Sequence, residues 1–305
     1  MREGQAKLIA TFEEIDGEAT FKPHTWRRPG GGGGWARVLE GGRIFERAGV
    51  NYSVIRGDEV PPSLAARHPG TEGKPYFVTG LSMVLHPRNP YVPAFHANYR
   101  YFEVGEAGDE GDNEMIPPDV WWFGGGADMT PNYPSKENAI YFHQTLKAQC
   151  DRHPVGDYAT LKKTCDTYFY IKHRHEMRGV GGIFFDELSP VKQGDWETDF
   201  SFVKDGVETL LELYPPIVRK HMDTPYGERE RTWQLLRRGR YAEFNLVYDR
   251  GTLFGLQTGG NIEAILMSMP PLAHWAFDVQ PEAGTPEAEM LSLLQPRDWV
   301  EEQPS

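Results

Sequence analysis

Residues 76–104, YFVTGLSMVLHPRNPYVPAFHANYRYFEV, predict an antiparallel pair of strands and so decide the fold class. Hydrophobic residues dominate 76–86 and 96–104, and the loop 87–95 between them holds three prolines. Proline fixes its own φ near roughly −65° and restricts the residue before it, so this loop is expected to be stiff. We therefore predict strands over 76–86 and 96–104 whose ends are held at a set separation.

The polar residues of this pair fall on one face. Because side chains alternate between faces, Ser82 and His86 share one face of the first strand. His96, Asn98 and Arg100 likewise share one face of the second. Pairing that is symmetric about the loop places His86 opposite His96 and Ser82 opposite Arg100. A core-facing strand does not normally carry this many polar groups, which indicates a binding or catalytic surface, although a bulge would move half of the set.

Further strand and helix patterns follow along the chain. Strands are predicted at 37–45 and 51–55 around a Gly-Gly turn, and at 120–125, 181–188, 240–249 and 252–257. Helices are predicted at 135–153, 157–177, 199–214, 228–238 and 285–294. Hairpins dominate the connections and no linker divides the chain. We predict one α+β domain over 1–305 with a mainly antiparallel sheet, and a peripheral acidic tail at 281–305.

The composition excludes several classes of protein. A formal net charge of −12 argues against a nucleic-acid surface, which normally carries a basic stripe. No run of about 18 apolar residues is present, so no membrane span is predicted. Cys150 and Cys165 form no CxxC pair, which fits free thiols in a reducing compartment. The acidic N-terminal segment is typical of neither a signal nor a transit peptide, so we expect a cytoplasmic protein.

Four histidines are candidates for a shared site. His143 and His173 fall on the apolar faces of predicted helices, while His86 and His96 lie at the ends of the two strands. Each of them alone is consistent with an ordinary, hydrogen-bonded histidine. Together they suit a divalent metal or acid–base chemistry, and the residues do not decide between the two.

Glycine-containing segments carry further candidates. Asp186 lies near the end of an apolar strand, either as a turn residue or as a buried acceptor for ligand N–H groups. In 121–126, WWFGGG, aromatic residues precede three glycines, which suits a broad planar or macrocyclic ligand. Core packing explains the aromatic residues equally well, but not the glycines. The five glycines at 30–34 are not expected to form a regular element, and indicate a flexible connector or a mobile flap.

Several long blocks resemble the aerobic, oxygen-dependent coproporphyrinogen-III oxidases of haem biosynthesis. They run in order between about Phe21 and about Trp275 and include GLSMVLHPRNPYVPAFHANYRYFE, WWFGGGADMTPNYP, FHQTLKAQCDRH, RGVGGIFFDEL and YAEFNLVYDRGTLFGLQTGGNIEAILMSMPP. The resemblance implies a sheet flanked by helices on both faces. It also implies oxidative decarboxylation of the ring A and ring B propionates of coproporphyrinogen III to vinyl groups. Oxygen would be consumed, and carbon dioxide and hydrogen peroxide released.

The resemblance also implies roles for particular residues. His96 matches a proton-donating histidine, and Asp186 an aspartate that engages pyrrole N–H groups. The implied substrate-binding positions are Ser82, Asn98, Tyr99, Arg100, Gly259, Gly260 and Asn261. The implied ligands of a divalent metal, usually manganese, are His86, His96, His143 and His173. The resemblance implies no organic cofactor and a homodimer formed through about 241–276.

Two departures from the family pattern stand out. Position 261 is Asn261, where the pattern commonly has arginine, so a contact with a substrate carboxylate there would need another cation or a neutral hydrogen bond. At residues 94–95 this chain has AF, where the family pattern contains a threonine. Two other functions remain open on the residues alone: a metal-dependent hydrolase or oxygenase built on the four histidines, and a tetrapyrrole carrier without catalytic activity.

Overall fold

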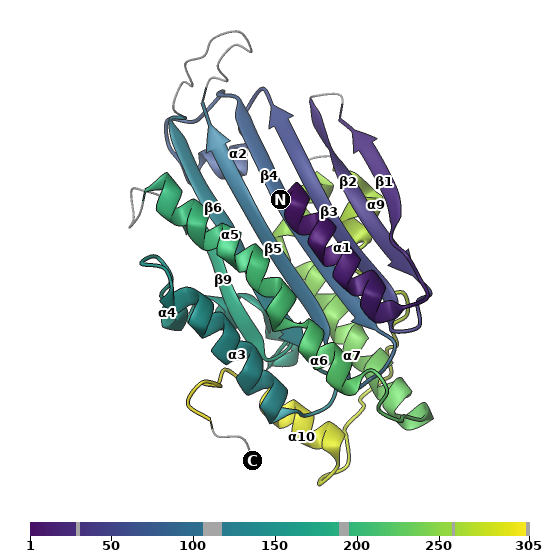
Figure 1. The fold of residues 1–305 in the computed structure, drawn as a ribbon. Helices are drawn as coiled ribbons and strands as arrows, with labels where there is room; N and C mark the ends of the chain where they lie inside the picture. Colours follow the sequence, from purple (N-terminus) through teal and green to yellow (C-terminus); the bar gives the residue numbers. More distant parts are fainter. Residues whose placement is uncertain (29–30, 106–117, 189–194, 258–259, 303–305) are drawn as a thin grey trace.

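One large antiparallel sheet forms the centre of the molecule (Figure 1). The computed structural model describes residues 1–28, 31–105, 118–188, 195–257 and 260–302. Within this part the sheet has the strand order β1-β2-β3-β4-β5-β6-β9. Its strands are β1 (Lys22–Arg27), β2 (Gly32–Glu40), β3 (Phe45–Gly57), β4 (Tyr76–Pro87), β5 (Ala94–Val104), β6 (Val120–Thr130) and β9 (Gly181–Leu188). A small separate hairpin consists of β7 (Tyr170–Ile171) and β8 (Glu176–Met177).

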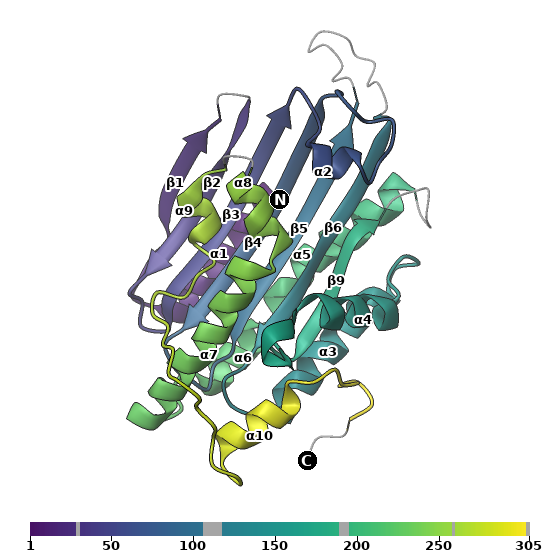
Figure 2. The ribbon, with the colours of Figure 1, turned by 180° about the vertical axis from the view of Figure 1, so that it is seen from behind.

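Helices cover both faces of the sheet, which confirms the predicted α+β architecture. Figure 1 shows α1 (Arg2–Asp16), α3 (Lys136–Asp151), α5 (Trp196–Leu213) and α6 (Pro215–His221) on one side. Figure 2 shows α2 (Pro62–Ala65), α7 (Glu228–Val247), α8 (Arg250–Gln257) and α9 (Ile262–Leu266) on the other. The remaining helices are α4 (Tyr158–Tyr168) and α10 (Pro286–Leu293).

The β4–β5 hairpin has the predicted faces but a different register. Ser82 pairs with Asn98 and not with Arg100, a shift of two residues from the predicted pairing. The loop is shorter than expected, because β4 runs through Pro87 and β5 begins at Ala94. A shift of two residues leaves every side chain on its own face, because side chains alternate with a period of two. The polar face is therefore preserved with different opposite partners.

The odd-numbered residues of β4 and β5 face the main hydrophobic core. Leu81, Met83, Phe95 and Ala97 are each at most 1% exposed. They belong to one cluster with apolar residues of α1, α3 and α5. Full burial of one such large side chain stabilises the fold by about 1.5–3 kcal/mol, so the odd face is fixed toward this core. The even-numbered residues are left to face α7, α8 and α9.

Residues 240–257 form helices, and the hairpin predicted there is wrong. The buried residues of α7 include Trp233, Arg237, Tyr241 and Phe244. They recur every three or four positions, as on one face of a helix. The aromatic and β-branched residues of this segment favour strands locally, but burial of one helical face against the sheet decides the structure.

The helix predicted at 157–177 ends early. α4 stops at Tyr168, Phe169 caps it, and the chain then forms the β7–β8 hairpin. His175 occupies the turn of this hairpin in the left-handed region, at φ 54°. His173 therefore lies in an exposed turn, with 40% of its side chain accessible, and not on the expected buried ridge.

The glycine run extends into the sheet. Gly32, Gly33 and Gly34 open β2 and pair with β3, and Gly33 and Gly34 also pair with β1. The prediction that the run forms no regular element is therefore wrong for these three residues. A Cβ at Gly34 would lie 2.0 Å from the ring of Trp26. Glycine thus lets an indole ring lie directly on the strand, while residue 30 falls outside the described part.

The segment after 281 contributes to the core, in contrast to the solvated tail expected from its acidic composition. Met290 and Leu294 are fully buried, and Trp299 is 1% exposed. All three belong to the main hydrophobic cluster. The ring of Trp299 stacks on that of His143, with 6.3 Å between centroids.

Replacing Trp299 by alanine is expected to destabilise the protein by about 3–5 kcal/mol, because the change removes a large, fully buried side chain. Denaturant-induced unfolding followed by circular dichroism measures this. Tyr226→Ala is the matched control, since the Tyr226 ring is 42% exposed and should change stability by less than about 1 kcal/mol. Equal effects of the two changes would show that Trp299 is not part of the core.

Candidate active site

Half-buried polar side chains form one surface on the α7 side of the sheet, which we call the polar face: Asn51, Ser82, His96, Asn98 and Arg100. Asn51, Ser82 and Asn98 lie opposite one another across β3, β4 and β5. The Oδ1 atoms of Asn51 and Asn98 have no hydrogen-bond partner within the described part of the chain. The structure therefore brings together most of the polar residues expected from alternation and adds Asn51.

His96 connects the polar face to a buried ion pair. Its Nδ1 lies 2.8 Å from Oδ1 of Asp128, which is directly opposite on β6. Arg178 donates from Nη2 to both oxygens of Asp128 at 2.8 Å. Asp128 and Arg178 have side chains only 2% exposed, whereas that of His96 is 23% exposed.

The charge of Asp128 fixes the tautomer of His96. Burial alone would raise the pKa of the Asp128 carboxyl, but the Arg178 charge and the hydrogen bond from His96 outweigh it and lower that pKa. An ionised carboxylate only accepts hydrogen bonds, so Nδ1 of His96 carries a proton. Nε2 is then the atom of His96 that is available to take or give a proton at the polar face.

Arg178 is held in an aromatic cage. Its guanidinium carbon lies 4.1 Å from the ring centroid of Phe169, 4.6 Å from Tyr241 and 4.8 Å from Phe244. Nη1 donates to Oδ1 of Asn245 at 2.5 Å. Aromatic faces and a carboxylate are both favoured partners of a guanidinium, so the cage that holds Arg178 also fixes the position of Asp128.

A second group of charges lies further along the same face. Three arginines surround the carboxylate of Asp186, and we call Arg67, Arg100 and Arg250 the arginine cluster. Arg100 donates to Oδ1 of Asp186, and Arg250 donates from Nη1 to Oδ2 at 2.8 Å. Arg67 reaches Oδ2 at 3.4 Å and a Glu187 oxygen at 3.2 Å. Asp186 is thus engaged with arginines and is not an unoccupied acceptor.

The glycines of 121–126 make room for a side chain of β5 and for the backbone of β9. Gly124 lies opposite Arg100, and a Cβ there would lie 2.8 Å from the guanidinium carbon. A Cβ on Gly126, whose φ is 152°, would lie 2.2 Å from a carbonyl oxygen of β9. Trp122 and Phe123 are 3% and 2% exposed and belong to two different hydrophobic clusters. These two rings are therefore core residues, and a flat ligand surface is not present there.

Tyr99 does not reach the polar face. As an odd-numbered residue of β5 it points into the main core, where it is 1% exposed. A Cβ on Gly206 of α5 would lie only 2.7 Å from the Tyr99 ring, which shows how closely helix and ring approach. The Tyr99 side chain alternates to the opposite side of the sheet, so it does not share a surface with Ser82 and Asn98.

His86 and His143 are buried on different sides of the sheet. Nε2 of His86 lies 2.9 Å from the Ser268 carbonyl oxygen. His143 lies 2.8 Å from the Tyr158 hydroxyl through Nδ1 and 3.0 Å from the Val180 carbonyl oxygen through Nε2. Burial, helped by neighbouring positive charges, lowers the pKa of each imidazole to about 3. Both histidines are therefore neutral, and His143 is already hydrogen-bonded through both nitrogens.

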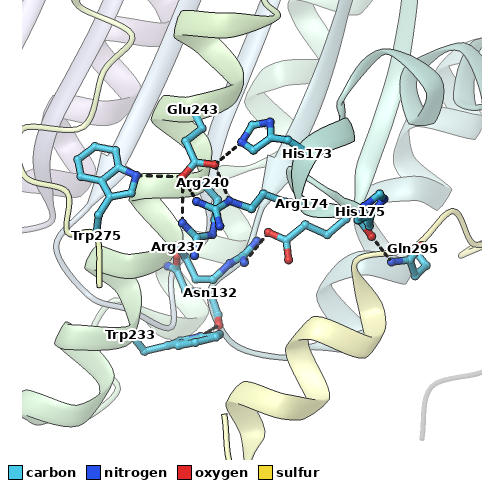
Figure 3. A network of polar contacts seen from close by, with 11 residues as sticks. Asn132, His173, Arg174, His175, Trp233, Arg237, Arg240, Glu243, Trp275 and Gln295 are labelled. Carbon is cyan, nitrogen blue, oxygen red and sulfur yellow. Dashed lines mark hydrogen bonds and ion pairs between the residues drawn. The ribbon is translucent and has the colours of Figure 1, made fainter. Parts of the chain in front are cut away.

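His173 belongs to a third environment, a polar network centred on Glu243 of α7 (Figure 3). Nε2 of His173 lies 2.7 Å from a Glu243 oxygen, and Arg174 binds the same carboxylate with two nitrogens at 2.7 and 2.8 Å. Arg240 donates to it at 2.9 Å, as does Nε1 of Trp275. This one carboxylate ties the β7–β8 hairpin and the segment after α9 to α7.

The four histidines do not form one metal site. Each has its own partners, and across the described ranges no group of three or more His, Cys, Asp or Glu side chains is placed to hold a metal ion. The residues therefore do not fit the manganese centre that the resemblance implied, because His143 lies in the core on the far side of the sheet and His173 in an exposed turn.

The expected contacts around residue 260 are only partly described. Asn261 caps α9, its side chain accepting from the Ala264 N–H at 2.9 Å. The Gly260 N–H donates to the Gly255 carbonyl at 2.8 Å. Asn261 thus serves as an ordinary N-cap residue. Gly259 lies outside the described residues.

Sequence reasoning missed Asp128, Arg178, Arg67, Arg250 and Asn51. Asp128 had a detectable signal, because it alternates with Gly124 and Gly126 on the face that meets His96. The arginines carried no local signal, since each joins the site through tertiary structure.

Among the described helices none is long and apolar enough to cross a membrane.

The Glu243 network predicts a specific acid sensitivity. Burial would raise the pKa of Glu243, but hydrogen bonds, chiefly from Arg174 and His173, outweigh it and lower the pKa from 4.5 to about 2. A depressed pKa contributes stability that is present above pH 4.5 and is lost as pH falls toward 2.

We expect Glu243→Gln to destabilise the protein by about 2 kcal/mol at pH 7, because the change removes charge-assisted hydrogen bonds. The difference from wild type should shrink steadily between pH 4.5 and pH 2. Urea unfolding at several pH values measures it, with Glu263→Gln, an exposed residue, as control. A difference independent of pH would contradict the assignment.

A family model described as coproporphyrinogen III oxidase matches residues 1–299 of the chain. The matched range contains the polar face, the Asp128–Arg178 pair and all three residues of the arginine cluster.

Proposed function

The chain belongs to the coproporphyrinogen III oxidase family, and from this premise we propose that the polar face is its active site. The enzyme is an oxidoreductase of the oxygen-dependent family that decarboxylates coproporphyrinogen III oxidatively in haem biosynthesis. The family uses oxygen and no organic cofactor. The observation that carries the proposed location is the exposed edge of His96, backed by a buried ion pair on the same face as Arg100.

The reaction defines what the protein must supply. Each propionate side chain loses carbon dioxide and becomes a vinyl group, and the two electrons removed from it combine with two protons to reduce oxygen to hydrogen peroxide. One of those protons comes from the substrate and one from the surroundings, because the carboxylate enters ionised. The porphyrinogen is electron-rich and supplies the electrons itself. The protein's part is then to orient the propionate and to move protons.

His96 is the proton-transfer group in this proposal. The Asp128 carboxylate holds the imidazole with Nδ1 protonated, so that Nε2 faces the substrate side. When Nε2 takes a proton, the neighbouring carboxylate stabilises the resulting positive charge. Ser82 and Asn98 lie opposite each other on β4 and β5, next to His96 on the polar face, and supply hydrogen bonds that position the substrate. The four histidines are not arranged to hold a metal ion, so no step is assigned to one.

We further infer a homodimer formed through about 241–276. Large apolar side chains that are more than a third exposed occur within this range, at Leu246, Val247, Phe254, Leu256, Ile262, Leu272 and Trp275, and directly after it, at Phe277 and Val279. Exposed apolar patches of this kind mark protein–protein interfaces. The free thiols of Cys150 and Cys165 support the proposal of a cytoplasmic protein, since disulfides are rare in reducing compartments.

His96→Ala is expected to lower kcat by roughly 10²–10⁴, the usual contribution of a positioned acid–base group. Separation of the vinyl products by chromatography under air measures the rate, and wild-type enzyme without oxygen gives the background. His24→Ala, on the exposed edge strand β1, is the matched control and should retain full activity. Wild-type turnover by His96→Ala would remove His96 from the mechanism.

The dimer is tested separately. Leu272→Asp combined with Phe277→Asp should shift the protein from dimer to monomer in sedimentation velocity, because both side chains are more than half exposed in one subunit. Phe200→Asp, on the opposite side of the sheet, should leave the sedimentation coefficient unchanged. A monomeric wild type would contradict the inferred assembly.

A further inference from the structure

We propose that the arginine cluster binds the two propionates that coproporphyrinogen III retains, and that Arg67 and Arg250 determine specificity for them. This inference rests on the function proposed above and assigns the part of the substrate that the cluster holds. Asp186 would then be the resting counter-ion of the cluster, which a substrate carboxylate displaces.

The cluster is assembled by the fold and is not a local run of charge. Arg67 follows α2, Arg100 lies on β5 and Arg250 begins α8, yet all three converge on one carboxylate. Three positive charges face the two negative charges of Asp186 and Glu187. In a chain with a net charge of −12, this leaves a local positive excess at the polar face.

Two aromatic rings fix the position of the Arg250 guanidinium. Its guanidinium carbon lies 4.7 Å from the centroid of Tyr168 and 5.7 Å from that of Phe184, and these two rings stack at 4.2 Å. The Tyr168 hydroxyl accepts from the Arg250 backbone N–H at 3.0 Å and donates to Asp249 at 2.9 Å. Little side-chain freedom remains to be lost when Arg250 binds an anion.

Arg67 is positioned by a small core of its own. Leu64 is buried with Phe102 and Trp122 in a cluster separate from the main core. The ring of His68, next to Arg67, stacks on Trp122 with 4.3 Å between centroids. The backbone at Arg67 is therefore fixed over the end of the sheet, while 48% of its side chain is exposed and able to reach a ligand.

All three guanidiniums keep donors for a ligand. A guanidinium has five N–H donors, and a carboxylate such as Asp186 offers two oxygens. The side chains of Arg67 and Arg250 are 48% and 55% exposed, and Asp186 itself is 27% exposed. The cluster thus combines accessible donors with a replaceable anion, which is what bidentate binding of two further carboxylates requires.

Ion pairing also decides which propionates bind there. Decarboxylation neutralises a carboxylate, so cations that bind the carboxylate stabilise the ground state more than the transition state and slow the reaction. A site with three arginines therefore suits propionates that must not react. His96 lies four residues from Arg100 on β5, about 13 Å along the strand. A macrocycle anchored at the cluster extends toward His96 and presents its other side to it.

Stable porphyrins test the assignment directly. Coproporphyrin III carries four propionates, whereas mesoporphyrin IX carries only the two that the enzyme retains. Fluorescence quenching measures the Kd of each for wild type and for Arg67→Ala/Arg250→Ala at low salt. We expect the double variant to weaken both porphyrins by a similar factor, about 10- to 100-fold. Unchanged binding of mesoporphyrin IX would overturn the inference.

Two further variants sharpen the result. Arg67→Lys/Arg250→Lys keeps the charge but loses the planar fork, so an intermediate loss is expected. Asp186→Asn removes the resting counter-ion, and both porphyrins should bind about 3- to 10-fold more tightly. Weaker or unchanged binding by Asp186→Asn would show that no carboxylate displaces it, and would count against the inference.

The control and the kinetics separate this inference from the proposed function. Arg43→Ala removes an exposed arginine paired with Asp223 and should leave both Kd values unchanged. In turnover, Arg67→Ala should raise KM with little change in kcat, because the lost contact is equal in ground and transition states. If wild type forms no vinyl product, the proposed function fails. If wild type is active and Arg67→Ala keeps the wild-type KM, only the present inference fails.

Discussion

The buried ion pair between Asp128 and Arg178 is the interaction on which the rest of the site depends. It joins β6 to the chain just before β9, and its arginine is enclosed by residues of α7. Removing one partner of such a pair typically costs about 3–5 kcal/mol, because a charge is left buried without compensation. Replacing both partners by apolar groups is often harmless elsewhere, but here it would leave His96 without the acceptor that sets its tautomer. The pair is therefore explained better by the chemistry of His96 than by stability.

The polar face was predictable to the extent that it follows from a period of two. A shift in the pairing of β4 with β5 by an even number of residues leaves every side chain on its own face. The predicted register was wrong by two residues, so it still placed the same residues on one face: Ser82, His96, Asn98 and Arg100. The same rule should have excluded Tyr99, whose odd number places it in the core. The place of Asp186 at the end of an apolar strand allowed a ligand-binding role, but it did not predict three arginines there, because Arg67 and Arg250 reach Asp186 only through tertiary structure.

The wrong expectations share one physical cause, which is that burial decided the local structure. The aromatic residues of α7 favour strands, yet their spacing buries one helical face against the sheet. The acidic segment after 281 looked solvated, yet Met290 and Trp299 fill the core. His143 and His173 looked similar in sequence, but the first lies on the buried face of α3 against Trp299 and the second lies in a turn with His175. None of these outcomes follows from the local sequence pattern.

The position of Trp299 has a consequence for how the protein is made. The main hydrophobic cluster contains Leu8 and Phe12 of α1 together with Trp299, so the first and the last elements of the fold complete the same core. Such a core has many contacts between distant parts of the chain, which slows folding. Until the ribosome has released residue 299, the growing chain exposes apolar surface that the finished protein hides, and it depends on protection from aggregation for that time. A chain that ended before Trp299 would remain in that unprotected state.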